Sequence, residues 1–401
     1  MTFRNPTGVA VTLVAAGEVS VDHPFFQSLG TNGRTCASCH AMEAAWTITP
    51  ALVRARFDAT AGLDPIFRLN DGSNAPTADV STVEARRTAY SQLLGKGLIR
   101  IGLPIPPGAE FILTAVDDPY GYASAAELSL FRRPLPATNL AFLSTVMWDG
   151  RETVPEQSIS ADLATQANGA TVGHAQGPPL STSQRDQIVA FELGLFSAQA
   201  RDVGAGPLRG GGHQELVTVP FHLGINSPQD PTGAPVLARA FTLYDGWAGA
   251  TGVRGQARQS IVRGQAIMNQ RVFTGGLTCT SCHNAPNVGS SSTGGLFDIG
   301  MSDGARRTPD LPLYTFSCFA GPRAGQVITS TDPGLALITG RCVDFGRFKV
   351  PTLRGLAARP PHFHNGSAGN LEAVVDFYNA RFSIGLSPGE RSDLVAFLRA
   401  L

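Results

Sequence analysis

The chain has 401 residues, and its 31 Lys and Arg residues balance its 31 Asp and Glu residues, so the formal net charge is zero. Only 15% of the residues are charged and no basic run occurs, which argues against nucleic acid or anionic membrane as a partner. The 45 Gly and 28 Pro residues predict long ordered loops between short helices, in a chain long enough for two or three modest domains.

The first predicted element is the apolar segment GVAVTLVAAG at residues 8–17. This segment is too short to cross a membrane, and no other apolar run approaches the required length, so we expect no membrane span. A β-strand is the favoured interpretation of the segment, and the remnant of a signal peptide is the alternative.

A Cys-x-x-Cys-His motif at residues 36–40 returns at residues 279–283. Zinc ribbons place two Cys pairs close together and thioredoxin-type pairs need no following His, whereas covalent haem attachment needs all three residues. Two such motifs predict two covalently bound haem c groups, with the motif His as the proximal iron ligand in each. Haem is attached outside the cytoplasm, so we expect an exported, periplasmic protein whose signal peptide is missing from this chain. The attachment residues are Cys36, Cys39, His40, Cys279, Cys282 and His283.

The segment between Arg54 and Arg133 is polar and rich in turn residues. We expect it to cover the first haem and to shape access to the iron. Substrate selection should therefore depend on this segment, although its sequence does not identify a substrate.

Two segments with helical spacing resemble each other, RDQIVAFELGL at residues 185–195 and RSDLVAFLRAL at residues 391–401. Residues 387–390, SPGE, precede the second one and predict an N-cap, a first-turn proline and a capping-box Glu. Each haem motif is thus followed by a closing amphipathic helix, as in small cytochromes c. We therefore predict a mainly α fold with long ordered loops and little β structure, built from cytochrome c-like domains at residues 1–203 and 204–401.

Two further features lie in the second half of the chain. A helix at residues 257–273 is predicted to lead into the second haem motif, and GSSSTGG at residues 289–295 is predicted to be a loop. Cys318 and Cys342 suit a disulfide in an exported protein, closing a loop of about 25 residues and contributing roughly 3 kcal/mol. Two separate buried thiols are the alternative.

The motifs resemble those of bacterial di-haem cytochrome c peroxidases and the related MauG enzymes. The resemblance also rests on MWDGRE at residues 147–152 and on FKVPTLRGLAARPPHFHNGSAGNLEAVVDFYN at residues 348–379, and it extends over most of the chain. It implies a peroxidase-type oxidoreductase that activates hydrogen peroxide at the haem of His40 and shares oxidising equivalents with the haem of His283.

The resemblance also implies a role for Trp148, because in the family the Trp of this segment lies between the two haems. An aromatic ring at that place shortens the electron-tunnelling gap and can itself be oxidised transiently. A buried core Trp with a partner for its indole N–H is the alternative.

On the far side of the second haem, the family carries an iron ligand at a fixed spacing after the His that corresponds to His364. The same spacing reaches Tyr378, where the peroxidases have Met and the MauG enzymes have Tyr. A phenolate is a hard anionic ligand that favours oxidised iron. The alternative is a helix-face aromatic, with the iron open or ligated by His362, His222 or His213.

The first haem differs from that of the peroxidases, in which a His in the loop after the motif blocks the iron. No His occurs between His40 and Trp148, so we expect this haem to be open or water-bound. Peroxide cleavage needs a base and a polar group. The family's distal Gln corresponds to Gln166, with Gln157 as the alternative, and its distal Glu falls on a segment without a carboxylate. His174 is the candidate there, either as distal base or as iron ligand, and a surface His is the alternative.

The family often binds calcium through an Asn ahead of the Trp segment, and counting back from Trp148 places Arg133 there. We therefore predict no calcium at that site, because the guanidinium replaces the charge of the ion. Arg132, Arg133 and Arg359 are instead candidates to pair with haem propionates, with ordinary surface salt bridges as the alternative.

The sequence thus predicts a periplasmic di-haem c-type oxidoreductase that uses hydrogen peroxide. Its electron donor, a protein or a small organic molecule, is not identified. One alternative is a di-haem oxygenase that activates dioxygen, as the rubber oxygenases of the same wider family do, and an apolar distal pocket would favour it. Another is a non-catalytic electron-transfer protein, which needs both irons six-coordinate.

Overall fold

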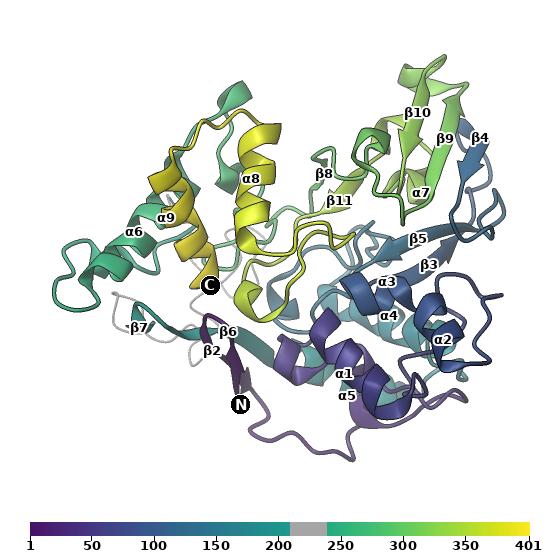
Figure 1. The fold of residues 1–401 in the computed structure, drawn as a ribbon, viewed down its shortest axis with the longest axis horizontal. Helices are drawn as coiled ribbons and strands as arrows, with labels where there is room; N and C mark the ends of the chain where they lie inside the picture. The colour runs from purple at the N-terminus through teal and green to yellow at the C-terminus, as the bar shows by residue number, and fades with distance from the viewer. Residues whose placement is uncertain (209–238) are drawn as a thin grey trace.

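The computed structural model describes residues 1–208 and 239–401 (Figure 1). The structure is 34% helical and 17% strand and contains several sheets, so the prediction of a mainly α fold with little β structure is wrong. That prediction weighed the helices beside the haem motifs and treated the Gly- and Pro-rich stretches between them as loops. Short strands form in those stretches wherever apolar side chains alternate, as in the buried-every-second-residue pattern of residues 313–318. His213 and His222 lie outside the described residues.

A four-stranded antiparallel sheet holds the start of the chain. Its order is β1 (Thr2–Asn5), β2 (Gly8–Val14), β6 (Leu195–Asp202) and β7 (Gly206–Pro207). β2 confirms the predicted strand in the apolar segment, and it pairs with the strand that follows the first closing helix. The sheet therefore fixes the beginning of the chain beside the end of the first predicted half.

Five helices belong to the first half: α1 (Pro50–Thr60), α2 (Val83–Ala89), α3 (Ser91–Lys96), α4 (Ile159–Gly173) and α5 (Thr182–Leu193). The last of these contains most of the predicted closing helix and begins with a capping box between Ser181 and Gln184. It packs against α4, and Ile188, Phe191 and Leu195 join one buried cluster. α4 and α5 form one wall of the site described below.

The second half contains α6 (Gly255–Gln270), α7 (Ala336–Thr339), α8 (Leu371–Arg381) and α9 (Pro388–Arg399). α6 and α9 confirm the predicted helices, and the predicted capping box of Ser387 and Glu390 opens α9. The two helices approach closely at Gly264, where an added Cβ would lie 2.0 Å from the Asp393 carbonyl oxygen. The largest buried cluster lies around them and includes Phe241, Trp247, Ile261, Leu394, Phe397 and Leu398.

Three further small sheets occur among the described residues, and one of them connects the two halves. β3 (Ile99–Leu103) pairs with β5 (Leu128–Arg132), β8 (Leu296–Asp298) pairs with β11 (Arg347–Lys349), and β9 (Leu313–Cys318) lies between β4 (Phe111–Asp117) and β10 (Val327–Ser330). Because β4 comes from the first half and β9 from the second, one sheet crosses the predicted domain boundary. The division at residue 204 stays a prediction.

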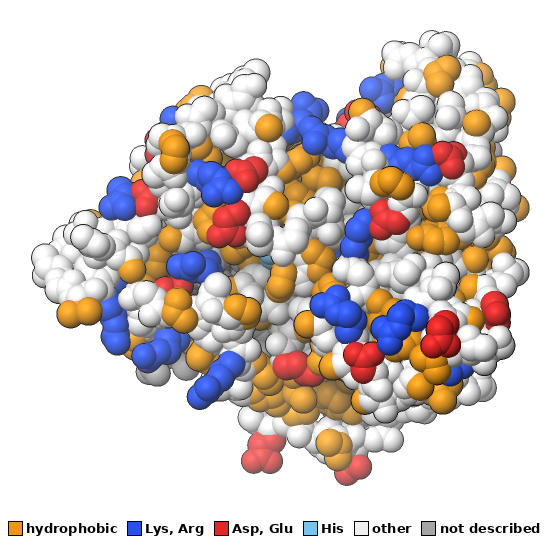
Figure 2. Space-filling view, in the orientation of Figure 1, with side chains coloured by type: hydrophobic (Ala, Val, Ile, Leu, Met, Phe, Trp, Pro, Cys, Tyr) orange, Lys and Arg blue, Asp and Glu red, His pale blue; other side chains and the backbone are white. Residues whose placement is uncertain are grey.

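The predicted disulfide is present between Cys318 and Cys342, at the end of β9 and after α7. It lies in a buried cluster with Phe111, Phe316 and Phe345. In Figure 1 this sheet forms a lobe on the opposite side of the molecule from α6, α8 and α9. Figure 2 shows apolar side chains gathered in the hollow between the two lobes, and positive and negative side chains interspersed over the same face.

A buried ionic cluster joins three distant segments. Arg132, at the end of β5, donates to Asp332 through Nε at 2.6 Å and Nη2 at 2.8 Å, and to Asp149 through Nη1 at 2.5 Å. All three residues are at most 2% exposed. Burial alone would lower the pKa of the Arg132 guanidinium, but the two carboxylates raise it overall. The cluster therefore holds the first half, the Trp148 segment and the second half against one another.

Replacing Arg132 with Met should strongly destabilise the protein, because two buried carboxylates lose their cation. We expect a loss of about 3–5 kcal/mol in the free energy of unfolding, measured by chemical denaturation. Arg391→Met is the matched control, since Arg391 holds Asp376 through two bonds of 2.5 and 2.6 Å at the surface. Solvent screening should make the loss in the control much smaller. Equal losses in the two variants would contradict a central role for the buried cluster.

Candidate haem sites

The two Cys-x-x-Cys-His motifs fold into the same tight turn. Cys36–Ser38 and Cys279–Ser281 each form one turn of 3-10 helix. In each, the Ser hydroxyl accepts a hydrogen bond from the N–H of the preceding Thr, at 3.0 Å in the first turn and 2.9 Å in the second. The N–H of the motif His donates to the carbonyl of the first Cys at 3.0 Å in both. Two copies of one local structure therefore present thiols and imidazole in the same way.

The two motif imidazoles are oriented by equivalent hydrogen bonds. Nδ1 of His40 lies 3.1 Å from the Trp46 carbonyl oxygen, and Nδ1 of His283 lies 2.5 Å from the Gly289 carbonyl oxygen, six residues further on in each case. A carbonyl only accepts, so Nδ1 carries the hydrogen and Nε2 keeps a free lone pair. Burial lowers the pKa of His40 to about 4 and also lowers that of His283. Both rings are therefore neutral at pH 7, as an iron ligand must be.

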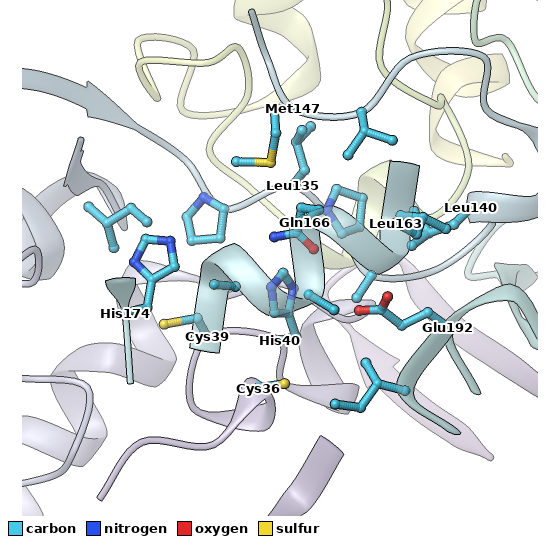
Figure 3. A pocket seen from close by; sticks show the side chains of 18 of the residues that line it. Cys36, Cys39, His40, Leu135, Leu140, Met147, Leu163, Gln166, His174 and Glu192 are labelled. Carbon is cyan, nitrogen blue, oxygen red and sulfur yellow. The ribbon is translucent and has the colours of Figure 1, made fainter. Parts of the chain in front are cut away.

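The first cavity lies over His40 and contains about 1470 Å³ of space free of protein atoms, its mouth included. Figure 3 shows His40 in the middle of it, with Gln166 above the ring and with His174 and Glu192 on opposite sides. Most other side chains of its walls are apolar, among them Leu135, Leu140, Leu143, Val146, Met147 and Leu163.

The second cavity lies over His283 and contains about 1800 Å³ of such space. α6, α8, α9 and the segment at residues 348–364 form its walls. Each cavity thus opens beside one pair of thiols and one imidazole, the set of groups that attaches and ligates haem c. The residues present fit haem c at both places.

One wall separates the two cavities and lines both. It consists of Arg133, Pro134, Pro136, Trp148, Lys349 and Pro351. The indole N–H of Trp148 donates to the Arg133 carbonyl oxygen at 2.8 Å, and the Trp148 carbonyl oxygen accepts from the N–H of Lys349 at 2.9 Å. Trp148 thus stands between the predicted haem sites with its ring held in place, and its indole N–H has a partner, as a core Trp would require.

Three buried cations at or beside this wall have no carboxylate partner among the described residues. Arg133 donates to the carbonyl oxygens of Ile48 at 2.7 Å and Lys96 at 3.1 Å, and Arg359 and Lys349 also donate to carbonyl oxygens. Burial lowers the pKa of Arg133 to about 9, of Arg359 to about 10 and of Lys349 to about 7, and the charge of Arg359 further lowers that of Arg133. These groups fit the carboxylates of haem propionates.

Arg132, unlike these three cations, has carboxylate partners. It was a candidate for a propionate partner or a surface salt bridge, and its guanidinium instead pairs with Asp149 and Asp332 in the interior. Local sequence gave no sign of this pairing, because Asp332 lies 200 residues from Arg132 in the chain.

The candidate far-side residues of the second haem line the second cavity. Tyr378 lies on α8, and its hydroxyl makes no hydrogen bond to another described residue; burial raises the pKa of this phenol. His364 is 3% exposed, its Nε2 atom has no partner, and its ring stacks on Phe348 with a centroid distance of 4.0 Å. His362 lines the same cavity. Which of the three faces the iron stays a prediction.

The structure separates the two Gln candidates at the first haem. Gln166 on α4 lines the first cavity, whereas Gln157 lies outside it on the surface beside Asn168 and Arg185. His174, at the end of α4, also lines the cavity. The assignment of catalytic roles to Gln166 and His174 stays a prediction.

His174 has a buried partner that sequence reasoning missed. Nδ1 of His174 contacts one carboxylate oxygen of Asp71, and Arg34 contacts the other. Although burial alone would raise it, the pKa of Asp71 is lowered by the hydrogen bond and charge of His174 and by Arg34. Asp71 therefore holds the His174 ring with Nε2 left free for the cavity. No local signal indicates this pair, because the residues are 103 positions apart.

Glu192 was also missed, although the sequence contains a signal for it. It follows Ile188 by four residues and so falls on the apolar face of its helix, where a carboxyl group is out of place. The side chain is 6% exposed and lines the first cavity.

Comparison with known proteins gives peroxidase and MauG relatives. The chain is 31% identical over 153 residues to the cytochrome-c peroxidase IdrP2 of Denitromonas iodatirespirans, covering 34% of this chain and 41% of the relative. It is 24% identical over 290 residues to IdrP1 of the same organism, covering 68% of each. It is 26% identical over 293 residues to MauG of Methylorubrum extorquens, covering 67% and 64%. The match thus spans about two fifths of the first relative and about two thirds of the others.

No family model matches the chain. Among solved structures, a MauG-like protein associated with microbial copper homeostasis is 17% identical with a TM-score of 0.46, covering 100% of this chain and 93% of that one. A likeness at that level carries no conclusion about this chain.

Two Cys-x-x-Cys-His turns, each with a free imidazole nitrogen beside an apolar cavity, define a protein of the c-type cytochrome class. Its relatives are cytochrome c peroxidases and MauG proteins. These relatives support the predicted resemblance of the chain to the bacterial di-haem cytochrome c peroxidase and MauG family. Haem c is the cofactor that this family implies.

The described residues offer no grouped metal ligands and no helix that could span a membrane. In residues 1–208 and 239–401, no three His, Cys, Asp or Glu side chains are grouped so that they could hold a metal ion. The absence of calcium stays a prediction. Within the same residues, none of the helices has the length and apolarity needed to cross a membrane.

The pairing of Asp71 predicts a pH-dependent contribution to stability. A carboxyl group whose folded pKa lies below its ordinary value of 3.8 stabilises the protein above that value, and the contribution is lost as the pH falls through the folded pKa. Asp71→Asn should therefore cost about 1.5–3 kcal/mol in free energy of unfolding near neutral pH. The difference in free energy of unfolding between the variant and the unchanged protein should shrink as the pH falls below the ordinary pKa of 3.8. Denaturation at several pH values measures it, with Asp22→Asn at an exposed position as control, and a pH-independent difference would contradict the assignment.

Proposed function

We propose that this protein is an exported, periplasmic di-haem c-type oxidoreductase of the peroxidase type. It activates hydrogen peroxide at the haem of His40 and shares oxidising equivalents with the haem of His283 through Trp148. The observation that carries the proposal is the position of Trp148, which lines both cavities from their common wall. When bound, haem supplies the iron at which peroxide is activated and from which electrons are withdrawn.

Trp148 suits the role of a conduit. Its ring lies edge-on to that of His364, with a centroid distance of 6.2 Å, so aromatic groups continue from the common wall into the second cavity. The hydrogen bond from its indole N–H to the Arg133 carbonyl fixes the ring and stabilises the positive charge that partial oxidation would create. Asp149, the next residue, places a buried carboxylate beside it.

His174 and Gln166 suit the handling of peroxide. Because Asp71 accepts from Nδ1 of His174, Nε2 is free to take the proton that peroxide must lose. Gln166 presents an amide group to the same cavity and can polarise the O–O bond. Asp71 is thus a positioning residue for His174, in a cavity that otherwise offers mostly apolar walls.

Tyr378 lines the same cavity as His283 and would supply a second ligand to the iron of a haem bound there. Burial raises the pKa of its phenol and so favours the protonated form, and a bound ferric iron would favour the phenolate. A hard anionic ligand favours the oxidised iron, which allows the second haem to hold part of the oxidising equivalents.

A di-haem oxygenase that activates dioxygen is the second candidate. The apolar walls of the first cavity favour it, because an apolar molecule enters such a site readily. A ferric protein that ignores peroxide, and that binds dioxygen once reduced, would select this candidate.

Covalent attachment gives the first prediction for the purified holoprotein. We expect two haems per chain, retained after denaturation, as measured by intact-mass spectrometry and iron content. The double variant with Cys36→Ser and Cys39→Ser should keep one covalent haem, because each thiol pair attaches its own group. Loss of both haems, or an unchanged mass, would contradict independent attachment at two sites.

Peroxide chemistry is tested by the visible and EPR spectra of the ferric protein. We expect a high-spin signal at rest, since the segment between His40 and Trp148 contains no His that could block the first iron, and we expect its loss after one equivalent of hydrogen peroxide. His174→Gln should slow this reaction by about 10²- to 10⁴-fold, the usual contribution of a proton acceptor. Stopped-flow absorbance measures the rate.

His23→Gln is the control for this variant, because the His23 ring packs against Phe191 and does not line the first cavity. It should react at the normal rate. If His174→Gln also reacts normally, the role of His174 is wrong. If both haems of the unchanged protein are low-spin and ignore peroxide, the peroxidase proposal is wrong and electron transfer is favoured.

A further inference from the structure

Glu192 is a buried carboxylic acid in the wall of the first cavity. It lies one residue before the end of α5, is 6% exposed and points its carboxyl group into the cavity (Figure 3). Oε2 has no hydrogen-bond partner, and no hydrogen bond or ion pair to the carboxyl group occurs among the described residues. An acid buried in this way without a partner costs stability, so its presence calls for a reason.

The internal repeat of the chain shows that the acid is specific to the first cavity. IVAFELGL at residues 188–195 corresponds to LVAFLRAL at residues 394–401, so Ile188 matches Leu394 and Glu192 matches Leu398. Both members of each pair line the cavity of their own half. At the position where the second half presents Leu398 to its cavity, the first half presents a carboxyl group.

Burial sets the charge state of this group. It raises the pKa of Glu192 to about 8, so the carboxyl group is largely protonated at neutral pH. The charged or titratable groups nearest to α5 are His23, Cys36, His40 and Asp162, on segments that pack against it. The remaining walls of the cavity carry Arg34, Arg132, Arg133, Arg151, His174 and Lys349. Among the described residues no cation pairs with Glu192, so extra positive charge in the cavity would favour loss of its proton.

We propose that Glu192 couples a proton to electron transfer at the first haem. With haem bound beside His40, loss of one electron from this site to a one-electron mediator would be accompanied by breaking of the O–H bond of the Glu192 carboxyl group, and the proton would pass to water. The carboxylate left behind offsets the positive charge that the cavity has gained, and reduction reverses both transfers. The second haem lacks this coupling, because Leu398 occupies the matching position. The proposal rests on haem being bound beside His40 and does not depend on peroxide chemistry.

Potentiometric titration of the holoprotein with soluble mediators tests this at a series of pH values from about 6 to about 9. We expect one of the two reduction potentials to fall by about 59 mV per pH unit. This slope corresponds to a tenfold change in the equilibrium constant of a one-electron transfer for each pH unit. The other potential should not respond to Glu192 and serves as an internal reference. Glu192→Gln and Glu192→Leu should each abolish the pH dependence of the first potential.

Asp186→Asn is the matched control, because Asp186 is an exposed acid on the same helix. It should keep the pH dependence of the unchanged protein. Glu192→Leu places in α5 the residue that α9 already carries at this position, and Glu192→Gln keeps the shape of the side chain, so loss of the slope in both reports on the proton and not on packing. A slope that persists in both variants, or two flat potentials in the unchanged protein, would overturn the proposal.

The two proposals fail separately. If peroxide leaves the spectrum unchanged while the first potential depends on pH through Glu192, only the peroxidase function is wrong. If peroxide reacts and the first potential is flat, only the role of Glu192 is wrong.

Discussion

The structure depends on the pairing of Arg132 with Asp149 and Asp332. Each of these residues comes from a different segment, and none is more than 2% exposed, so none can find a substitute partner in water. The guanidinium satisfies both carboxylates at once, which fixes the Trp148 segment between the two halves of the chain. The common wall of the cavities is consequently set by an interaction that no local pattern of the sequence reveals.

That wall also carries cations that lack carboxylate partners. Arg133 and Lys349 line both cavities and Arg359 lines the second, and burial lowers the pKa of each. Buried cations of this kind destabilise a protein unless anions pair with them. Haem propionates would supply these anions, so binding of the cofactor would complete the electrostatics of the fold as well as the site. The same cations lie in the wall that contains Trp148, so their positive charge would affect how easily its ring is oxidised.

Sequence reasoning succeeded where the determinants are local. The haem-motif turns, the strand at residues 8–14 and the capping box of α9 each depend on a few neighbouring residues, and all are present. The fold class was wrong because pairs such as β4 with β9 bring together segments about 200 residues apart, and short strands of this kind have no helical period to reveal them. Asp71 escaped notice for the same reason, since its partnership with His174 exists only in three dimensions.

The repeat within the chain gives the two sites a common framework and different chemistry. The turns match, and each proximal imidazole donates to a carbonyl six residues further on. The groups around them differ: His174, Gln166 and Glu192 at the first cavity would exchange protons or polarise bonds, whereas Tyr378 at the second would supply an anionic ligand. A reaction that consumes peroxide needs protons where peroxide reacts, and storage of oxidising equivalents needs an electron-rich ligand where they are held. Glu192 stands where the second half has Leu398, and it fits this division. Its carboxyl group adds an exchangeable proton to the first cavity, where peroxide would react.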